Sequence, residues 1–283
     1  MPGKLYLCAT PIGNLGDMTP RAVEILKSVD LIAAEDTRNS LKLLTHFGIR
    51  TPMTAYHEFN RYDKAEELVK KILDGADVAC ITDAGTPGIS DPGEVLARKC
   101  MDAGIEVSSV PGACACISAL IISGLSTRRF RFEAFLPPEK KARKEILDNL
   151  KNDAATLVIY EAPHRLSETL KDLLQALGDR KLSLCKELTK VHENVSRTTI
   201  SEAVKRFSEE EARGEYVLVI EGKSLGDLRE ESREAFQKIS MEEHLESYVS
   251  EGLSRMEAMK RVAKDRGLSK REVYAALNRD DKA

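Results

Sequence analysis

Hydrophobic positions in the first half of the chain form short apolar runs, separated by segments in which apolar residues recur with helical spacing. The apolar runs predict strands at residues 4–9, 30–35, 52–56, 77–83 and 105–112. The periodic segments predict helices at residues 19–29, 40–47, 63–73 and 93–104, the first with Thr19 as its N-cap and Pro20 at its first position. Strands that alternate with helices and are apolar throughout are typical of a parallel sheet covered on both faces.

A second α/β pattern begins after a boundary near residues 124–129. Strands are expected at 131–137, 156–160, 181–188 and 215–221, and helices at 140–152, 165–177 and 201–210. The interpretation is an N-terminal α/β domain over residues 1–124 and a second α/β domain over 125–223. From 224 to 239 the chain is polar and charged, as a linker is.

The last part of the chain, residues 240–283, carries a short internal repeat, GLSRMEA at 252–258 and GLSKREV at 267–273. Ser254 with Glu257, and Ser269 with Glu272, each match the S-x-x-E capping box that begins a helix. Two helices joined by a short turn predict a small helical domain similar to a helix-turn-helix.

The overall charge does not favour a nucleic-acid binder, because 43 basic and 46 acidic residues leave a net charge of −3. Affinity for RNA must then come from a local patch. Residues 254–279 hold eight basic residues against three acids, two of which belong to the capping boxes. The basic residues are Arg255, Lys260, Arg261, Lys264, Arg266, Lys270, Arg271 and Arg279, and Lys260, Arg261, Lys264, Lys270 and Arg271 are the proposed RNA contacts. The alternative is a solvated helical hairpin that packs on the body or on a partner subunit.

Cysteine and histidine usage points to a reduced protein without a metal. The six cysteines contain no C-x-x-C pair and stand mostly in apolar runs, which is typical of buried thiols in a cytosolic protein. No histidine pair has the H-x-x-x-H spacing of a metal site. The N-terminus lacks a signal-peptide pattern, and the apolar run near residues 117–125 is too short to span a membrane. We expect a cytoplasmic location and no membrane partner.

Three glycine-containing loops follow strands of the first predicted sheet. The loop at 10–17, TPIGNLGD, has Glu35 about twenty residues later, but its G-x-x-G pattern is not the G-x-G-x-x-G of a nicotinamide dinucleotide site. The loop ITDAGTPGISDPG places Asp83 where it can accept a hydrogen bond, and Gly85 lets a ligand approach the backbone. Gly112 opens the third loop, PGACA. Ligands of parallel sheets bind at the carboxyl ends of strands, so these loops predict a ligand site, with structural turns as the alternative.

The second α/β segment adds acidic, basic and cationic residues at strand ends. The stretches YEAPHR (160–165) and KELTKVHEN (186–194) supply Glu161, Lys186, Glu187 and Lys190, a set suited to proton removal and anion binding. No G-x-S-x-G sequence is present, which disfavours a serine hydrolase.

Together these stretches resemble the tetrapyrrole methylase superfamily, and within it the branch that methylates small-subunit ribosomal RNA. The matching segments run in order over residues 4–222 and include LYLCATPIGNLGD, AAEDTRNSLKLL, ITDAGTPGISDPG, VPGACA, FLPP, VIYEAPHRL, KELTKVHE and GEYVLVIEG. Two departures stand out: Thr82 replaces a serine, and Cys114 replaces a hydroxyl residue in the family's usual PGPSA.

The resemblance implies a fold class of two α/β domains with a cofactor cleft between them, plus the small C-terminal helical domain. It implies a homodimer that binds S-adenosylmethionine and methylates a cytidine 2′-hydroxyl of 16S ribosomal RNA in the small ribosomal subunit. Carried over by motif, the cofactor contacts are Pro11, Asp83, Thr86, Cys114, Ala115 and Tyr160; the loop argument adds Gly13, Gly85 and Gly112.

The implied reaction is an in-line displacement, in which the enzyme aligns two reactants and helps to remove the hydroxyl proton. The candidates for this catalysis are Glu35, Asp36, Arg38, Glu161, Lys186, Glu187 and Lys190, although a surface salt-bridge network explains several of them equally well. The rival functions are a methyltransferase for a corrin or porphyrin precursor, a nicotinamide oxidoreductase, and a binding protein without cofactor.

Overall fold

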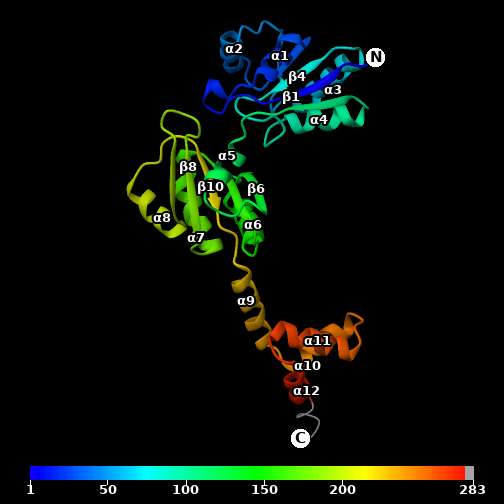
Figure 1. Ribbon diagram of the computed structural model, residues 1–283, viewed down its shortest axis with the longest axis vertical. Helices are drawn as coiled ribbons and strands as arrows, with labels where there is room; N and C mark the ends of the chain where they lie inside the picture. The colour runs from blue at the N-terminus through cyan, green and yellow to red at the C-terminus, as the bar shows by residue number, and fades with distance from the viewer. Residues whose placement is uncertain (278–283) are drawn as a thin grey trace. The chain divides into compact units, whose positions relative to one another are not determined.

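The computed structural model describes residues 1–277, and these residues form two compact units (Figure 1). The first unit contains residues 1–147 and 156–221, and holds both α/β sheets. Among the described residues, the second unit contains 148–155 and 222–277, and is helical. Across residues 1–277, no helix is both long enough and apolar enough to cross a membrane.

The N-terminal sheet has five strands in the order β3-β2-β4-β1-β5, all parallel. Its strands are β1 (Lys4–Cys8), β2 (Leu31–Ala34), β3 (Met53–Ala55), β4 (Val78–Ile81) and β5 (Glu106–Val110). The helices are α1 (Pro20–Ser28), α2 (Thr37–His46), α3 (Arg61–Leu73) and α4 (Gly93–Asp102). The predicted parallel sheet is confirmed.

Two hydrophobic clusters cover the two faces of this sheet. One packs apolar residues of α3 and α4 against β1 and β4, and the other packs α1 and α2 against β2. Side chains cap the starts of two helices. The Thr19 hydroxyl accepts a hydrogen bond from the amide of Ala22, as expected, and Pro20 begins α1. Helix α2 begins three residues before its predicted start, because Asp36 caps it by accepting from the amide of Arg38.

The second sheet is mixed and has the order β6-β7-β10-β8-β9, in which β6 and β7 are parallel and the other pairs are antiparallel. Its strands are β6 (Phe130–Phe135), β7 (Thr156–Glu161), β8 (Lys181–Lys186), β9 (Asn194–Thr199) and β10 (Tyr216–Ile220). The helices are α6 (Lys140–Leu150), α7 (Pro163–Leu177) and α8 (Ile200–Glu209), and α7 packs with α8.

Helix α5 (Ala115–Ile122) and strand β9 of the first unit have no counterpart in the sequence prediction. Helix α5 is apolar around most of its surface, so it shows no helical period. It packs on β7 and β10 of the second sheet, although it precedes the expected boundary at residue 124. Strand β9 is a polar edge strand, NVSRTT, and lacks the apolar character of the other strands.

The helical unit contains α9 (Leu225–Gln237), α10 (Met241–Ser250), α11 (Arg255–Arg266) and α12 (Lys270–Leu277). Residues 224–239, expected as a linker, therefore form a helix for most of their length. Both predicted capping boxes are confirmed, since Ser254 and Glu257, and likewise Ser269 and Glu272, exchange hydrogen bonds with each other's backbone. A third capping box, Ser240 with Glu243, begins α10.

Candidate active site

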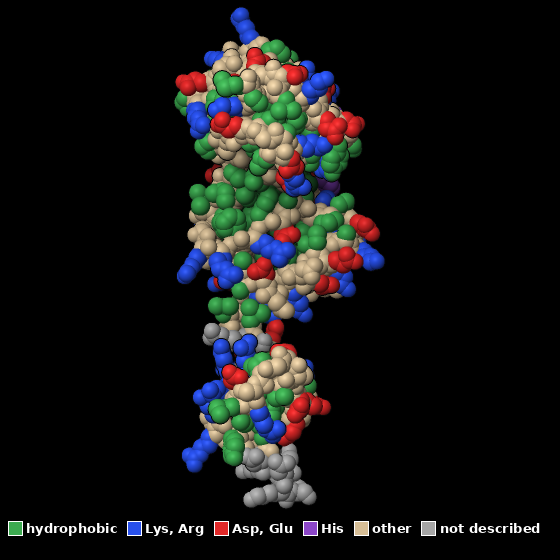
Figure 2. Space-filling view, turned by 90° about the vertical axis from the view of Figure 1, so that its right-hand side faces the viewer, with side chains coloured by type: hydrophobic (Ala, Val, Ile, Leu, Met, Phe, Trp, Pro, Cys, Tyr) green, Lys and Arg blue, Asp and Glu red, His purple; other side chains and the backbone are tan. Residues whose placement is uncertain are grey.

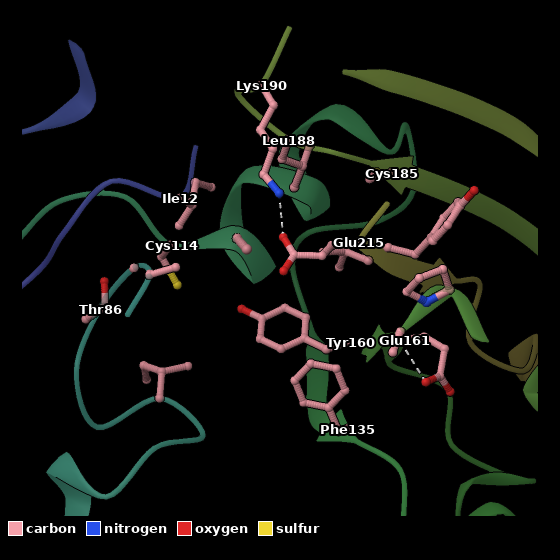
Figure 3. A pocket seen from close by; sticks show the side chains of 18 residues that line it. Ile12, Thr86, Cys114, Phe135, Tyr160, Glu161, Cys185, Leu188, Lys190 and Glu215 are labelled. Atoms are coloured by element: carbon pink, nitrogen blue, oxygen red, sulfur yellow. Dashed lines mark hydrogen bonds and ion pairs between the residues drawn. The ribbon is translucent and has the colours of Figure 1, made fainter. Parts of the chain in front are cut away.

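A cavity of about 360 Å³ lies in the first unit, between the loops that follow β1, β4 and β5 of the N-terminal sheet and strand ends of the second sheet (Figure 3). This volume falls within the range of roughly 300–1,000 Å³ that small-molecule sites occupy. Its wall is mostly apolar. The lining residues are Ile12, Ala84, Gly85, Thr86, Ile89, Cys114, Ala115, Phe135, Tyr160, Glu161, Ala162, Pro163, Cys185, Leu188, Lys190, Glu215, Tyr216 and Val217.

Hydrogen bonds join the three glycine loops beneath this cavity. Thr10 and Gly85 exchange both of their backbone hydrogen bonds, at 2.8 and 3.1 Å, so the first loop is tied to the second. Gly85 has φ +86°, a conformation that favours glycine, and a side chain there would also press on Ile12. The Thr86 hydroxyl donates to the carbonyl of Ala113 at 2.9 Å, which fixes the second loop to the third.

Tyr160, at the end of β7, connects the second sheet to the third loop. Its hydroxyl accepts a 3.0 Å hydrogen bond from the backbone amide of Cys116 in the first turn of α5. The rings of Phe132 and Phe135 meet its ring edge-to-face, with centroids 4.9 and 5.5 Å away. Burial, followed by the neighbouring cysteines, raises the pKa of Tyr160, so the phenol is neutral near neutral pH. This ring forms a fixed wall of the cavity (Figure 3).

The thiols of Cys114 and Cys116 lie 3.4 Å apart at the start of α5. Cys114 is half-buried and lines the cavity, whereas Cys116 is buried behind it. The hydrogen bond from the Cys116 thiol, opposed by burial but supported by nearby backbone amides, lowers the pKa of Cys114 to about 6. The same hydrogen bond, together with burial, raises the pKa of Cys116. Cys114 is therefore the thiol of the pair that ionises.

Lys190 forms the cationic part of the cavity wall. Its Nζ lies 2.7 Å from Glu215 Oε2 and 3.0 Å from Glu187 Oε1 (Figure 3 shows the first pair). The turn that carries it is strained, with φ +51° at Glu187 and +65° at Thr189. Burial lowers the pKa of Lys190, but the two carboxylates outweigh it, so the pKa is raised and the ammonium form is held.

Several of the residues expected from the sequence line this cavity. Of the expected cofactor contacts, Gly85, Thr86, Cys114, Ala115 and Tyr160 do so, and of the candidates for catalysis, Glu161 and Lys190 do so. The structure places the remaining ones beside the cavity or away from it: Pro11, Gly13, Asp83, Gly112, Glu35, Asp36, Arg38, Lys186 and Glu187. Gly13 is a near neighbour, because a Cβ on it would lie 2.3 Å from Cγ of Lys190.

A separate group of carboxylates lies where β2 and β4 end. Glu35 Oε2 accepts a 2.6 Å hydrogen bond from the hydroxyl of Thr82, and Asp83 Oδ1 accepts a 3.1 Å bond from the amide of Asp36. Burial, and after it the charge of Glu35, raises the pKa of Asp83. Arg38 is 90% exposed and pairs with Asp36 at 3.5 Å. These residues form a polar rim on the strand ends of the N-terminal sheet.

Two of the candidates for catalysis have other surroundings. The Glu161 carboxylate is buried and accepts hydrogen bonds from the amide of Ala162 and from the hydroxyl of Thr169, so it fixes the start of α7. Lys186 faces a second, smaller cavity, whereas the preceding Cys185 faces the main one. The alternation of side chains along a strand puts these two neighbours on opposite faces of β8.

The cavity also contains residues that the sequence reasoning did not single out. Phe135, Leu188, Glu215 and Tyr216 come from β6, the turn after β8, and the start of β10. Apolar residues at strand ends look like ordinary core in a sequence. Glu215 could have been found from the sequence, because this charged residue follows a glycine and directly precedes a buried strand. Glu161 and Lys186, which were singled out, are likewise charged residues at strand ends.

The chain is similar to known methyltransferases along nearly its whole length. A family model described as Tetrapyrrole (Corrin/Porphyrin) Methylases matches residues 4–204. A protein of Synechocystis sp. named "Ribosomal RNA small subunit methyltransferase I" is 48% identical, with 96% of each chain covered. Proteins with the same name from Halalkalibacterium halodurans and Bacillus subtilis are 46% and 44% identical, covering 96% and 98% of this chain and 93% and 94% of their own.

Solved structures share the fold over more than three quarters of the chain. Diphthine synthase matches with a TM-score of 0.60 at 14% identity, covering 79% of this chain and 91% of its own. Uroporphyrin-III C-methyltransferase from Thermus thermophilus, solved in complex with S-adenyl homocysteine, matches with a TM-score of 0.56 at 17% identity, covering 77% and 97%. These two structures support the fold alone. The family model spans more than half of the chain, and on that ground the chain belongs to the tetrapyrrole methylase family.

Proposed function

We propose that this chain is an S-adenosylmethionine-dependent methyltransferase that methylates the ribose 2′-hydroxyl of a cytidine in 16S ribosomal RNA. The observation that carries the proposal is similarity over the full length. The family model ends at residue 204, before the helical unit, whereas the relatives named for small-subunit ribosomal RNA cover 96–98% of the chain. The segment that contains the helical unit therefore lies outside the general family model but is shared with relatives named for ribosomal RNA. This favours RNA over a tetrapyrrole as the substrate.

The cavity fits the proposed cofactor. Its apolar wall, from Ile12 to Tyr160, suits the adenine ring and the methionine chain, while the backbone amide of Ala115, the first residue of α5, offers a polar group. Thr86, Cys114, Ala115 and Tyr160 would hold the cofactor. Bound there, S-adenosylmethionine supplies a methyl group on a positively charged sulfur, which is already activated for displacement.

The chain's own contribution is to orient the ribose and to take up its proton. Within the described residues, the charged side chains on the cavity wall are Glu161, Lys190 and Glu215. The Glu161 carboxylate already accepts hydrogen bonds from Ala162 and Thr169. The pair Lys190–Glu215 is therefore the proposed site of proton removal, with the Glu215 carboxylate as proton acceptor and Lys190 holding that carboxylate in place. The rim of Glu35, Asp36, Arg38 and Asp83 is proposed to contact the RNA.

The proposed RNA-binding surface of the helical unit consists of Lys260, Arg261, Lys264, Lys270 and Arg271, all of which are exposed. Figure 2 shows Lys and Arg side chains mostly along one side of this unit. The three acids among residues 254–277 are already engaged: Glu257 and Glu272 in capping boxes, and Asp265 with the Tyr248 hydroxyl at 2.6 Å. Arg266 is occupied as well, since it donates to His244 and to the carbonyl oxygens of Ile239 and Ser240. Arg279 lies outside the described residues.

We further propose that the protein works in the cytoplasm as a homodimer. Apolar side chains of the first unit are exposed at Ile117, Ile121, Phe130 and Phe135, with 42–67% of each side chain accessible. A second copy would cover such a surface, whereas a monomer leaves it in water. Sedimentation analysis of the purified chain distinguishes the two.

The proposed activity is tested with purified protein, S-adenosylmethionine labelled in its methyl group, and small ribosomal subunits or their RNA from cells lacking the protein. The expected product is 2′-O-methylcytidine after digestion to nucleosides. Methyl groups on a base, or methylation of uroporphyrinogen in place of RNA, would overturn the proposal. Calorimetry with S-adenosylmethionine alone separates an enzyme from a binding protein without cofactor, which would give no heat.

A further inference from the structure

The thiols of Cys114 and Cys116 stand at the proposed cofactor site, and Cys114 takes the place of a hydroxyl residue in the family's usual PGPSA sequence. The other four cysteines, Cys8, Cys80, Cys100 and Cys185, are buried. Cys114 alone combines an accessible position on the cavity wall with a second thiol 3.4 Å from its own sulfur. A thiol at a helix start with a second thiol beside it has the arrangement of an oxidation-sensitive site.

We propose that Cys114 and Cys116 form a reversible oxidation site for hydroperoxides, and that its oxidation closes the cavity to S-adenosylmethionine. The second half of this statement rests on the proposed function; the oxidation itself does not.

The chemistry balances with hydrogen peroxide as the oxidant. The Cys114 thiolate attacks one peroxide oxygen, the O–O bond breaks, and the product is a sulfenic acid with release of hydroxide, which a proton converts to water. The Cys116 thiol then attacks the sulfur of the sulfenic acid. An S–S bond forms, the S–O bond breaks, and a second water leaves with the proton of Cys116. Together the two thiols lose two electrons, which reduce one hydrogen peroxide to two water molecules, and a dithiol reverses the oxidation.

The local structure supports each stage. The first turn of α5 and the Cys116 thiol favour the thiolate of Cys114, which is the reactive form. Cys116 keeps its proton and is buried behind Cys114, outside the cavity. This is the position expected of a resolving thiol, the thiol that attacks the sulfenic acid. Burial raises the pKa of Cys8 to about 12 and that of Cys100 to about 11, so these thiols stay unreactive near neutral pH.

Oxidation would change the cavity because the same residues build it. A disulfide brings the two sulfurs from 3.4 Å to about 2.05 Å, which moves Cys114 off its place on the wall. The amide of Cys116 is bound to Tyr160, and Ala115 between the two cysteines lines the cavity. A movement of this turn therefore displaces two walls of the cavity together.

The experiment treats the full chain with hydrogen peroxide near neutral pH and measures intact mass, the oxidised residues by peptide mapping, and cofactor affinity by calorimetry. The expected result is a loss of two hydrogen atoms, confined to Cys114 and Cys116, and an affinity for S-adenosylmethionine weaker by about tenfold or more. Dithiothreitol should restore both. In Cys116→Ser the sulfenic acid should persist on Cys114 and react with dimedone, whereas Cys114→Ser should resist oxidation at this peroxide dose.

Two results would overturn the proposal. One is oxidation of Cys114 no faster than that of Cys8 or Cys100 in the same sample. The other is an oxidised pair with unchanged cofactor affinity. If the proposed function is wrong, the reduced protein itself does not bind S-adenosylmethionine. The oxidation of Cys114 and Cys116 can still be measured in that case, so the two failures are distinguished.

Discussion

The backbone amide of Cys116 donates its hydrogen bond to the hydroxyl of Tyr160, across 3.0 Å. This contact joins α5 to β7 through two residues that are 44 positions apart in the sequence. It also fixes the position of the ring that forms one wall of the proposed cofactor cavity.

Replacing Tyr160 by Phe should weaken cofactor binding and lower stability. The ring and its contacts with Phe132 and Phe135 remain, but the Cys116 amide loses its acceptor. Leaving a buried amide unpaired costs about 1–3 kcal/mol. Thermal unfolding and calorimetry with S-adenosylmethionine measure the two effects. Tyr274→Phe is the control, because Tyr274 is 61% exposed and outside the first unit. An unchanged melting temperature and affinity in Tyr160→Phe would show that this hydrogen bond is dispensable.

Replacing Lys190 by Met should slow methyl transfer while leaving cofactor affinity nearly intact. The variant keeps the side-chain stem against Gly13 but leaves Glu187 and Glu215 without their cation. A positioned acid–base group contributes about 10²–10⁴-fold to a rate, so single-turnover methylation should fall by at least about 100-fold. Lys190→Arg, which keeps the charge, should recover part of the rate. Full activity in the Met variant would remove this pair from the mechanism.

The buried ring of His244 predicts a pH dependence of the helical unit. Burial, followed by the charge of Arg266, lowers the pKa of His244 from 6.5, and the ring stacks on Phe236 with centroids 4.1 Å apart. Because the unfolded chain binds the proton more readily, the stabilisation is complete above pH 6.5. It is lost as the pH falls from 6.5 through the folded pKa. NMR titration of ¹³C-labelled histidine in the full chain, assigned with His244→Gln, should give a pKa below 6.5; a value at or above it would contradict the buried neutral ring.

The triple variant of Lys260, Arg261 and Lys264 to Ala should weaken RNA binding and reduce its dependence on salt. Each lost phosphate contact lowers the slope of log affinity against log salt by about 0.7–0.9. The matched control replaces Lys27, Lys70 and Lys71, which are exposed at the last turns of α1 and α3. Filter binding with small-subunit RNA across a salt series is the measurement. Equal slopes in wild type and the first triple variant would assign α11 a packing role only.

Much of the fold follows from sequence pattern because local chemistry and tertiary structure agree there. The apolar strands β1, β4 and β10 and the capped helices α1 and α11 carry unambiguous signals, and all were expected within a few residues. Helix α5 was missed because it is apolar around most of its surface, including the exposed Ile117 and Ile121, so it has no polar face on which a periodicity depends. Strand β9 was missed because an edge strand can be polar.

The site was predictable by loop but not residue by residue. Glycine loops at strand ends indicated the right edge of the sheet, and Gly85, Thr86, Cys114 and Tyr160 do line the cavity. Lys186 and Lys190 look equivalent in the sequence, yet the alternation of β8 and the strained turn after it send them to different cavities. Only the three-dimensional path of the chain brings Glu215 to Lys190.

The most direct test of the central claim is a map of methylated nucleotides in 16S ribosomal RNA from cells that lack this protein. The proposed function predicts that one cytidine loses its 2′-O-methyl group while other modifications remain. It also predicts that the wild-type chain restores the group and that Lys190→Met does not. An unchanged map in the deletion strain, or a lost methyl group on a base, would contradict the claim.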